Sequence, residues 1–447
     1  MEWTVVQGKH TDLMEINELY ELYQQSGKIS TDSRHIEPGS LFFALKGDRF
    51  NGNHFAGKAL EAGAAYAIVD EPEVLVPGSN MILVDDVLNT LQQLARFHRR
   101  KFNIPVIAVT GSNGKTTTKE LLSAVLSAHY PTHFTRGNLN NHIGVALTLL
   151  AMPDQTEVAV IEMGANAQGE IAFLCQIAEP THGVITNIGK AHLEGFGGIE
   201  GVKKGKSELY RYLEARKGTI FVNIEEPFLK ELSEAAPKRV LYGLSETPAA
   251  GAYPIGIKLV EVQPFVHLSM ADETGQLLAV HSHLIGRYNV GNLTTAIALG
   301  QYFKVPAQKI KAAIEAYIPG MNRSQILSLG SNTMILDAYN ANPSSMEAAL
   351  RNFAALPQHP KVAILGAMFE LGEAAVEEHA RIGRLAHGLG FEEVVLVGAD
   401  FQPIAEALGL RHFPDVSALR EWFQAQTWQG THFLLKGSRG MQLEKML

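Results

Sequence analysis

One stretch of the sequence has the residues needed to bind phosphate, Thr110-Gly111-Ser112-Asn113-Gly114-Lys115-Thr116-Thr117. An apolar run typical of a buried strand, residues 104–109, precedes it, and apolar residues at helical spacing follow it: Leu121, Leu122, Val125 and Leu126. A strand, a glycine loop and a helix bind anions through backbone N–H groups and the positive helix end. Lys115 adds a charge, and the Thr116 hydroxyl can bind Mg²⁺. The stretch therefore predicts a nucleotide-phosphate site.

The match to the common phosphate-loop pattern is incomplete, because Val109 stands where that pattern has glycine. This implies a shorter loop. An ordinary glycine turn before a helix remains the alternative interpretation.

Polar groups also follow two further predicted strands. Glu162 ends the buried run 158–162, and phosphate-loop proteins present an acid to Mg²⁺ in this way. His192 follows the run 183–188 and is a candidate ligand of a second metal, although a lone histidine is more often structural. The turn 138–144 contains Asn140, whose amide can donate to phosphate or cap the next helix.

Further candidates have an equally plausible structural explanation. Lys203, Lys204 and Lys206 on one predicted helix can form a solvated basic face, and Asn289 and Asn292 can bind a flat heterocycle such as adenine. The loops 30–34 and 46–50 place hydroxyls and cations where an anion could bind, but solvated loop charge is the simpler explanation. His281 and His283 are weak metal candidates.

Composition limits the functional class. The chain has 447 residues, 46% hydrophobic and 19% charged, with a net charge of -8, which argues against a nucleic-acid motor. Cys175 is the single cysteine and fits a reducing compartment. Met1-Glu2-Trp3 begins no signal peptide, and no run is long enough to span a membrane. We expect a cytoplasmic protein, without nucleic acid and monomeric.

The elements that position these residues predict an α/β protein of three domains. Residues 1–101 are expected to form a small α/β domain, with strands at 41–45, 65–69 and 81–84 and helices at 54–62 and 87–101. Residues 102–318 form the central parallel-sheet domain with the phosphate loop. Residues 319–447 form a Rossmann-like parallel sheet with strands at 334–337, 362–365, 394–397 and 433–435 and a helix at 376–388.

Several of these stretches together resemble the Mur ligases, ATP-dependent amide-forming enzymes of cell-wall precursor synthesis. The resemblance is carried by the phosphate loop, by Glu162-Met163-Gly164 and by residues 186–194 and 286–292, and it covers nearly the whole chain. The family's short glycine loop accounts for Val109. The stretches 337–346, 365–373 with His379, and 436–441 are similar to members that add D-alanyl-D-alanine to UDP-N-acetylmuramoyl-tripeptide.

The resemblance implies an acyl-phosphate mechanism with ATP and two Mg²⁺ sites, in peptidoglycan precursor synthesis. It implies that His192 contacts the second Mg²⁺ and that a carbamylated lysine lies nearby, for which Lys206 fits best and Lys203 and Lys204 are the fallback. The implied nucleotide residues are the loop residues 111–117, Asn289, Asn292, Arg323 and Asp337; the implied substrate residues are Ser33, Arg34, Lys46, Asn140, Asn340 and Ser345.

The chain departs from the family in two places. Asn51-Gly52-Asn53 stands where the family usually has Asp-Gly-His, and Ala367 stands where these members usually carry an acid. The Asp-Asn-Pro-Arg motif of the diaminopimelate-adding relatives is absent. A family ligase with another amine substrate, a nucleotide-binding scaffold without activity and a phosphate-loop motor remain the competing hypotheses.

Overall fold

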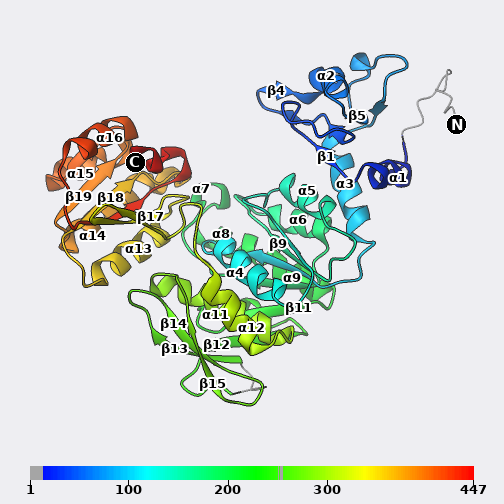
Figure 1. Ribbon diagram of the computed structural model, residues 1–447. Helices are drawn as coiled ribbons and strands as arrows, with labels where there is room; N and C mark the ends of the chain where they lie inside the picture. Colours follow the sequence, from blue (N-terminus) through cyan, green and yellow to red (C-terminus); the bar gives the residue numbers. More distant parts are fainter. Residues whose placement is uncertain (1–13, 250, 252–254) are drawn as a thin grey trace. The chain divides into compact units, whose positions relative to one another are not determined.

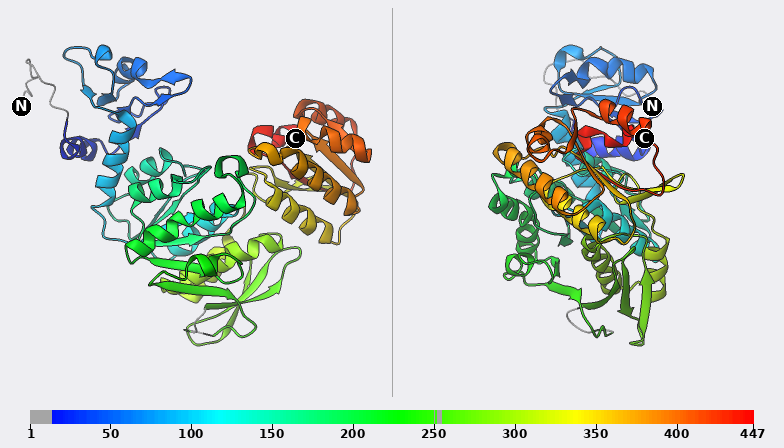
Figure 2. Two further views of the ribbon diagram at one scale, coloured as in Figure 1. Left: turned by 180° about the vertical axis from the view of Figure 1, so that it is seen from behind. Right: turned by 90° about the vertical axis from the view of Figure 1, so that its left-hand side faces the viewer.

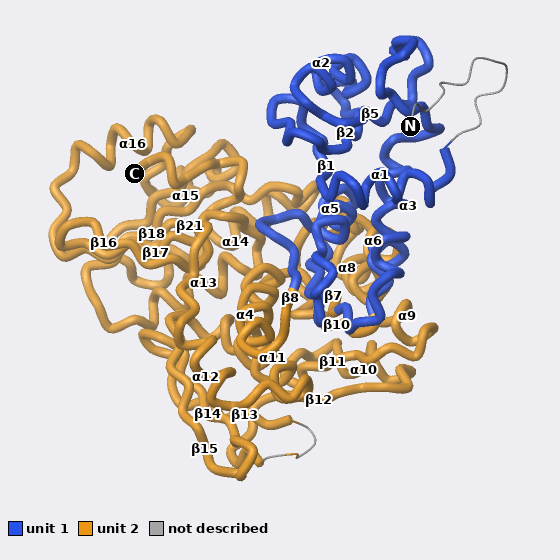
Figure 3. The backbone as a smooth tube through the Cα atoms, turned by 45° about the vertical axis from the view of Figure 1, so that its right-hand side comes forward, with its two compact units in different colours: residues 1–106, 133–163, 173–180 blue, residues 107–132, 164–172, 181–447 orange. Residues whose placement is uncertain are grey.

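The computed structural model describes residues 14–249, 251 and 255–447, and these form two compact units (Figure 3). The first comprises residues 1–106, 133–163 and 173–180, and the second comprises residues 107–132, 164–172 and 181–447. Met1-Glu2-Trp3, on which the signal-peptide prediction rests, lies outside the described residues. Within the described ranges, no helix is long and apolar enough to cross a membrane.

The first unit contains a four-stranded parallel sheet in the order β1 (Ile29–Ser30), β2 (Leu41–Phe43), β5 (Tyr66–Val69) and β6 (Met81–Leu83). All three predicted strands are confirmed, each slightly shorter than expected. The helix predicted from His54 instead begins as a 3₁₀ turn, η1 (Gly52–Phe55), and continues as α2 (Ala56–Glu61). The Asn51 side chain accepts from the Asn53 N–H and so tightens the first turn.

Helices complete this unit (Figure 1). Helix α3 (Val87–Arg99) is confirmed, with its predicted inner face buried and Asp86 as N-cap. Helix α2 packs on the sheet through Ala56 and Ala59, against Phe42 and Ala67. The same unit contains α1 (Ile16–Ser26), α5 (Gly144–Leu150), β9 (Val158–Glu162) and most of β8 (Thr132–Phe134).

The sheet of the second unit runs in the order β15-β14-β13-β12-β11-β10-β7. Its strands are β7 (Val106–Thr110), β10 (His182–Ile185), β11 (Thr219–Asn223), β12 (Arg239–Leu244), β13 (Ile255–Glu261), β14 (His267–Ala271) and β15 (Leu277–His281). Pairing is parallel from β7 to β13, as predicted, but β13, β14 and β15 pair antiparallel. The predicted parallel sheet is therefore confirmed from β7 to β13, and the strands beyond it form an antiparallel extension that was not predicted, in which the tight turn at Gly275 (φ +85°) returns the chain directly into β15.

Helix α4 (Lys115–Ser127) follows the phosphate loop, and the predicted residues Leu121, Leu122, Val125 and Leu126 are all buried. Helix α11 (Val290–Tyr302) packs closely on α4: a Cβ at Gly300 would lie 2.7 Å from Val125 Cγ1. The unit also contains α7 (Leu193–Phe196), α8 (Ile199–Lys206), α9 (Glu208–Ala215) and α12 (Ala307–Ala316). These helices and the sheet set the positions of the loops that follow the strands, where the polar candidate residues lie.

The C-terminal sheet has the order β16 (Gln325–Leu329), β17 (Asn332–Asp337), β21 (His432–Lys436), β18 (Lys361–Gly366), β19 (Glu393–Val397) and β20 (Arg411–Phe413). It is parallel except for the edge strand β16, which pairs antiparallel with β17 and was not predicted. Alternate strand residues face opposite layers. Helices α13 (Pro343–Ala355), α14 (Ala375–Gly388) and α15 (Gln402–Leu408) cover one face and α16 (Val416–Ala425) the other, so the predicted Rossmann-like layering is confirmed (Figure 2).

Candidate active site

The phosphate loop joins β7 to α4 and requires glycine at two positions. Gly111 has φ +142°, and a Cβ there would lie 2.0 Å from Thr186 Oγ1. Gly114 has φ +76°, and a Cβ there would lie 2.3 Å from Asn292 Oδ1. Residues with side chains rarely adopt such φ values, and neither position has space for one. The predicted strand, glycine turn and helix are confirmed.

The segment after β10 holds the loop in shape. The N–H groups of Ser112 and Asn113 donate to the backbone oxygen and to Oδ1 of Asn187, both at 3.0 Å. The Thr186 hydroxyl donates to the Asn113 carbonyl at 2.5 Å. These bonds explain why β10 ends at Ile185, whereas the sequence predicted a strand to Ile188: beyond Ile185 the chain supports the loop with side chains.

Two functional groups begin α4. The Lys115 Nζ donates to the carbonyl oxygens of Gly111 at 2.9 Å and Ser112 at 3.3 Å, so the ammonium lies over the loop. Thr116, in the first helical turn, is buried, and Thr117 is half-buried. An ammonium placed over a loop at a helix N-terminus is suited to neutralise phosphate oxygens.

Asn289 and Asn292 form a buried chain of amides. Asn292 Oδ1 accepts from the Thr118 hydroxyl at 3.0 Å, Asn292 Nδ2 donates to Asn289 Oδ1 at 2.7 Å, and Asn289 Nδ2 donates to the Ile285 carbonyl at 2.8 Å. This chain braces the start of α4 against α11. A contact of these amides with adenine stays a prediction.

His192 follows β10 in a left-handed backbone conformation, with φ +51°. Its Nδ1 contacts Glu370 Oε2, and this contact lowers the pKa of the Glu370 carboxyl. Lys190, two residues earlier, pairs with Glu378. The sequence predicted His192 as a metal ligand but did not predict Glu370, although Glu370 lies inside the recognised stretch 365–373.

Lys206 ends α8 and is completely buried. Its Nζ donates to the Ala165 carbonyl at 3.0 Å and lies 4.9 Å from the centre of the Phe196 ring. Burial, and secondarily the charge of Lys115, hold the pKa of the Lys206 ammonium well below its ordinary value. A solvated basic face describes exposed Lys204 but not Lys206, and Lys203 is paired with Glu200 at 2.8 Å.

The predicted nucleotide residues of the last sheet lie at the end of β17. Asp337 Oδ2 pairs with Lys436 Nζ at 2.5 Å, and Asp337 Oδ1 accepts from the Ser324 N–H at 3.1 Å. The Arg323 guanidinium lies 3.6 Å from the centre of the Tyr339 ring, with Nε buried and without a hydrogen-bond partner among the described residues. The sequence had marked Lys436 only as part of the stretch 436–441 and had not predicted it as the partner of Asp337.

The two residues proposed from the sequence for a dipeptide pocket have local partners. Ser345 forms a capping box with Asn342 at the start of α13, and Asn340 Oδ1 accepts from the Ala341 N–H. Asn342 also donates from Nδ2 to Asn113 Oδ1 of the phosphate loop at 2.7 Å. The sequence singled out Ser345, whereas the structure connects Asn342 to the loop.

A cavity of about 600 Å³ opens at the carboxyl ends of the C-terminal strands. Phe369, Asp400, Arg420, Met441 and Lys445 are among its lining residues, and Asn340 and Ser345 are not. Ligands of open α/β sheets bind at this edge.

In the first unit, Glu162 ends β9 and is 1% exposed, as predicted for a strand-end acid. Its Oε1 accepts from Asn140 Nδ2 at 2.7 Å, and its N–H donates to the Thr135 hydroxyl at 3.0 Å. The amide of Asn140 thus orients the carboxylate, a function that the sequence did not predict for it.

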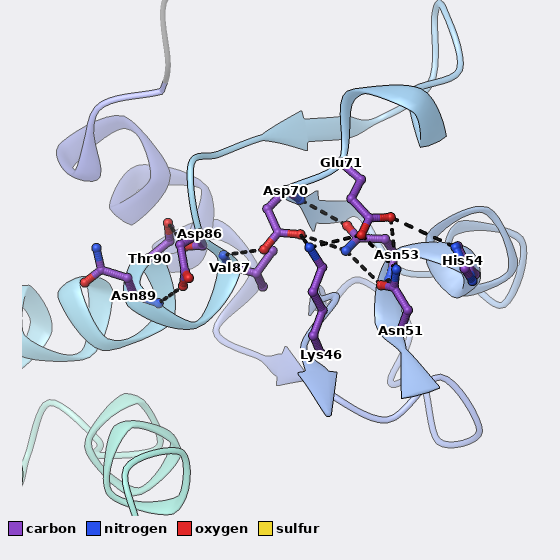
Figure 4. A network of polar contacts seen from close by, with 10 residues as sticks. All are labelled: Lys46, Asn51, Asn53, His54, Asp70, Glu71, Asp86, Val87, Asn89 and Thr90. Atoms are coloured by element: carbon purple, nitrogen blue, oxygen red, sulfur yellow. Dashed lines mark hydrogen bonds and ion pairs between the residues drawn. The ribbon is translucent and has the colours of Figure 1, made fainter. Parts of the chain in front are cut away.

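Lys46 lies in a network of polar groups in the first unit (Figure 4). Its Nζ is 2.9 Å from Asp70 and 3.0 Å from Glu71, and these two carboxylates raise the pKa of the Lys46 ammonium. Asn53 Nδ2 donates to Asp70 at 2.7 Å and Asn51 Nδ2 to Glu71 at 2.8 Å. The Asn-Gly-Asn departure therefore supplies amides that hold the two acids.

The other predicted residues of this unit lie nearby in sequence. Arg34 is exposed and pairs with Asp32 at 2.7 Å, and Ser33 lies in the turn between them. The described contacts do not join Ser33 or Arg34 to the Lys46 network. A common site for these three residues stays a prediction.

The side chains available as metal ligands suit an Mg²⁺ ion that takes most of its ligands from phosphate oxygens. Among residues 14–249, 251 and 255–447, no group of three or more His, Cys, Asp or Glu side chains could hold a metal. Thr116 and Glu162 offer a hydroxyl and a carboxylate, the oxygen ligands that Mg²⁺ prefers, and Mg²⁺ usually combines one or two such ligands with substrate phosphates. Each of the two side chains, Thr116 in the second unit and Glu162 in the first, is by its chemistry suited to this ion.

The second unit brings together the phosphate loop, Asn292, Asn187 and, through Asn342 and Glu370, residues of the C-terminal sheet. The first unit separately holds Glu162 with Asn140, and the Lys46 network. Asn187, Asn342 and Glu370 were missed as individual residues, although each lies in a stretch that the sequence had marked.

Comparison with known proteins gives the family. Three family models match the chain: "Mur ligase family, catalytic domain" over residues 27–99, "Mur ligase middle domain" over 109–300, and "Mur ligase, glutamate ligase domain" over 322–439. The UDP-N-acetylmuramoyl-tripeptide--D-alanyl-D-alanine ligase of Bacillus subtilis is 35% identical, covering 94% of this chain and 92% of that protein. The ligase of the same name from Escherichia coli is 34% identical, with 94% and 92% covered.

Solved structures of MurF enzymes match the fold of this chain over almost its full length. MurF from Acinetobacter baumannii has a TM-score of 0.84 at 32% identity, covering 95% of this chain and 96% of that one. MurF ligase from Thermotoga maritima in complex with ADP has a TM-score of 0.80 at 25% identity, with 94% and 96% covered. With its phosphate loop, its three matching domains and relatives that align along almost its full length, the chain belongs to the Mur ligase family.

Proposed function

We propose that the chain joins D-alanyl-D-alanine to UDP-N-acetylmuramoyl-tripeptide at the expense of ATP, in peptidoglycan precursor synthesis. The observation that carries this proposal is the alignment, over more than nine tenths of both partners, with ligases of that name. The phosphate loop and the stretches 337–346, 365–373 and 436–441 support it from the residues of the chain.

The chemistry requires an activated acid, because a carboxylate and an amine do not condense at neutral pH. A terminal carboxylate oxygen of the tripeptide attacks the γ-phosphorus of ATP, and ADP leaves. The amine of D-alanyl-D-alanine then attacks the acyl phosphate, phosphate leaves, and the amine loses a proton. Since two anions meet in the first step, catalysis rests on positioning and charge neutralisation.

The phosphate loop positions ATP and neutralises part of the charge on its phosphates. Residues Gly111, Ser112, Asn113, Gly114, Lys115, Thr116 and Thr117 hold the ATP phosphates, with the Lys115 ammonium as the fixed charge. Mg²⁺, when bound, neutralises the phosphate oxygens, and Thr116, Glu162 and His192 are the residues that would hold it. Two Mg²⁺ sites, with His192 at the second, are part of this proposal.

We infer that the amine of Lys206 becomes carbamylated. The neutral amine is the form that adds carbon dioxide, and burial favours that form at Lys206. The resulting carbamate is an anion and can ligand Mg²⁺. Purified protein exchanged into ¹³C-bicarbonate should give a carbamate signal in ¹³C NMR that disappears in Lys206→Met and persists in Lys204→Met.

The remaining residues are assigned to the substrates that the family resemblance implies for them. Asn289 and Asn292 serve the adenine, Asp337 the ribose, and Arg323 the γ-phosphate; the buried Nε of Arg323 supports a ligand contact there. Ser33, Arg34 and Lys46 serve the UDP-sugar. Asn140, Asn340 and Ser345 complete the substrate residues, and the local bonds of Ser345 make its contact with the dipeptide dependent on rearrangement.

We further place the enzyme in the cytoplasm as a monomer, with domains at residues 1–101, 102–318 and 319–447. The single cysteine supports the reducing compartment. The three matched family models, over 27–99, 109–300 and 322–439, are compatible with these boundaries.

Phosphate release from ATP and Mg²⁺ tests the proposal, with UDP-N-acetylmuramoyl-tripeptide and D-alanyl-D-alanine each omitted in turn. Release that requires both substrates supports the ligase. Replacing the dipeptide by diaminopimelate tests the competing amine, and equal release with it would contradict the assigned specificity. Release that ignores both substrates, or none at all with bicarbonate present, would reject the function.

A further inference from the structure

Glu370 approaches His192 from a different sheet. It lies between β18 and α14, in the loop 367–371, whereas His192 follows β10. Its Oε2 contacts His192 Nδ1, and the His192 side chain is 17% exposed. The contact therefore joins a residue of the C-terminal sheet to the residue proposed as a metal ligand.

The backbone holds both side chains in this arrangement. His192 has φ +51° and Glu370 φ +61°, a left-handed conformation that is uncommon for residues other than glycine. The Glu194 N–H donates to the Glu370 carbonyl at 3.4 Å, and a Cβ at Gly372 would lie 3.2 Å from Glu194 Cβ. Two such residues facing one another indicate that the contact is imposed by the fold.

A second contact braces the same two segments. Lys190 pairs with Glu378, and the Lys190 N–H donates to the Ser344 hydroxyl at 3.1 Å. Segment 190–194 is thus held by acids of segment 370–378. The position of Glu370 over the imidazole does not depend on one interaction alone.

The contact with Glu370 affects which ring nitrogen of His192 carries the proton. The contact is an ion pair and does not have the alignment of a hydrogen bond, since Nδ1 has no hydrogen-bond partner among the described residues. The negative charge beside Nδ1 favours a proton on that nitrogen, and the lone pair of neutral histidine then stays on Nε2. Metal-binding histidines commonly have such a carboxylate partner, which fixes the tautomer and ring orientation and raises the basicity of the ligating nitrogen.

We propose that Glu370 is a positioning residue, which orients His192 and fixes its Nδ1–H tautomer so that Nε2 is presented to a divalent cation. This inference rests on the proposed function, because it takes His192 as the ligand. Through Glu370, the loop that follows β18 of the C-terminal sheet would help to build the cation site.

The test uses the full chain and four variants: Glu370→Ala, Glu370→Gln, His192→Ala and the control Glu377→Ala. Glu377 is an exposed acid seven residues further along the chain, and no contact with His192 is seen for it among the described residues. Glu370→Gln keeps the size and shape of the side chain but loses the charge. Thermal unfolding of each variant establishes that it is folded.

The first readout is ¹⁵N NMR of histidine side chains, with the His192 signals identified by their loss in His192→Ala. We expect the Nδ1–H tautomer in the unmodified chain and in Glu377→Ala, and a mixture of tautomers in Glu370→Ala. Glu370→Gln, which lacks the charge, should also give a mixture. An unchanged tautomer in Glu370→Ala would overturn the proposal; if Glu370→Ala does not fold, an unchanged tautomer in Glu370→Gln would do so.

The second readout is Mn²⁺ binding in the presence of ADP, followed by electron paramagnetic resonance, which needs no turnover. We expect Glu370→Ala to weaken Mn²⁺ binding about 10- to 100-fold and Glu370→Gln less, with Glu377→Ala unchanged. Unchanged Mn²⁺ affinity in Glu370→Ala, with weakened affinity in His192→Ala, would reject the role of Glu370 alone. Unchanged affinity in His192→Ala would instead reject the metal ligand of the proposed function.

Discussion

Two lysines proposed for different tasks in the reaction have opposite surroundings. In the second unit, Lys206 at the end of α8 is completely buried, and its Nζ donates to one backbone carbonyl. In the first unit, Lys46 on β3 (Lys46–Gly47) is half exposed and lies between Asp70 and Glu71. Burial lowers the pKa of one ammonium, and two carboxylates raise the pKa of the other.

The difference shows that residue type did not decide the charge of either side chain. A buried amine without a carboxylate partner favours the neutral, nucleophilic form, which can be carbamylated. An amine between two acids stays a cation, but its charge is already balanced, so it adds little net attraction for a phosphate. The comparison therefore predicts a larger effect on the reaction from Lys206 than from Lys46, whose balanced charge would weaken its proposed contact with the UDP-sugar.

The largest effect is expected for Lys206→Arg. Arginine keeps the positive charge but cannot lose its proton or be carbamylated at neutral pH. We expect the rate of substrate-dependent phosphate release to fall about 100-fold, the scale of losing a metal ligand or its support. The exposed neighbour gives the matched control: Lys204→Arg should keep full activity. Near-normal rates in Lys206→Arg would show that neutrality at this position is not needed.

Glu226 tests whether burial alone can set a charge, as inferred for Lys206. Burial raises its pKa from 4.5 to about 7. Between these values the unfolded chain has lost the proton and the folded chain keeps it, so folding takes up a proton and stability falls as pH rises from about 4.5 to about 7. Glu226→Gln removes this loss, and we expect it to be more stable than the unmodified chain by about 2 kcal/mol above pH 7.

Denaturant unfolding between pH 4 and 9 measures this difference. Glu225→Gln, at the exposed neighbouring residue, should follow the pH dependence of the unmodified chain. A constant difference between Glu226→Gln and the unmodified chain at every pH would contradict the burial effect.

The smallest effect is expected for Lys46→Met. Since its charge is balanced by two acids, we expect the KM for the UDP-substrate to rise no more than about tenfold, equivalent to about 1.4 kcal/mol. Stability should fall by about 1 kcal/mol, because two partly buried carboxylates lose a donor. Steady-state kinetics and denaturant unfolding measure both, with exposed Lys58→Met as control. A 100-fold rise in KM would show that Lys46 leaves Asp70 and Glu71 to bind substrate.

Local pattern predicted most of the fold. Residues 158–162, 87–99 and 376–388 form the expected strand and helices, because apolar spacing is a property of a single element. The antiparallel β13–β15 and the edge strand β16 were not predicted. The direction of pairing depends on how the connection returns the chain, which the apolar pattern of one strand does not contain.

Residue spacing also marked the phosphate loop, since two glycines, a lysine and a threonine between a strand and a helix are read from a few consecutive positions. The partners of this loop were not readable in the same way. Asn187 and Asn342 lie 74 and 229 residues from Asn113, and their hydrogen bonds exist only because three segments meet.

The α/β class, the phosphate loop and the family could be read from the amino-acid sequence alone. They could be read because they depend on apolar period, on φ values open only to glycine, and on short runs of residues. The burial of Lys206, the two acids beside Lys46 and the contact of Glu370 with His192 became visible only in the folded chain. Charge state and tautomer depend on solvent exclusion and on partners distant in sequence, and both come into existence when the chain packs.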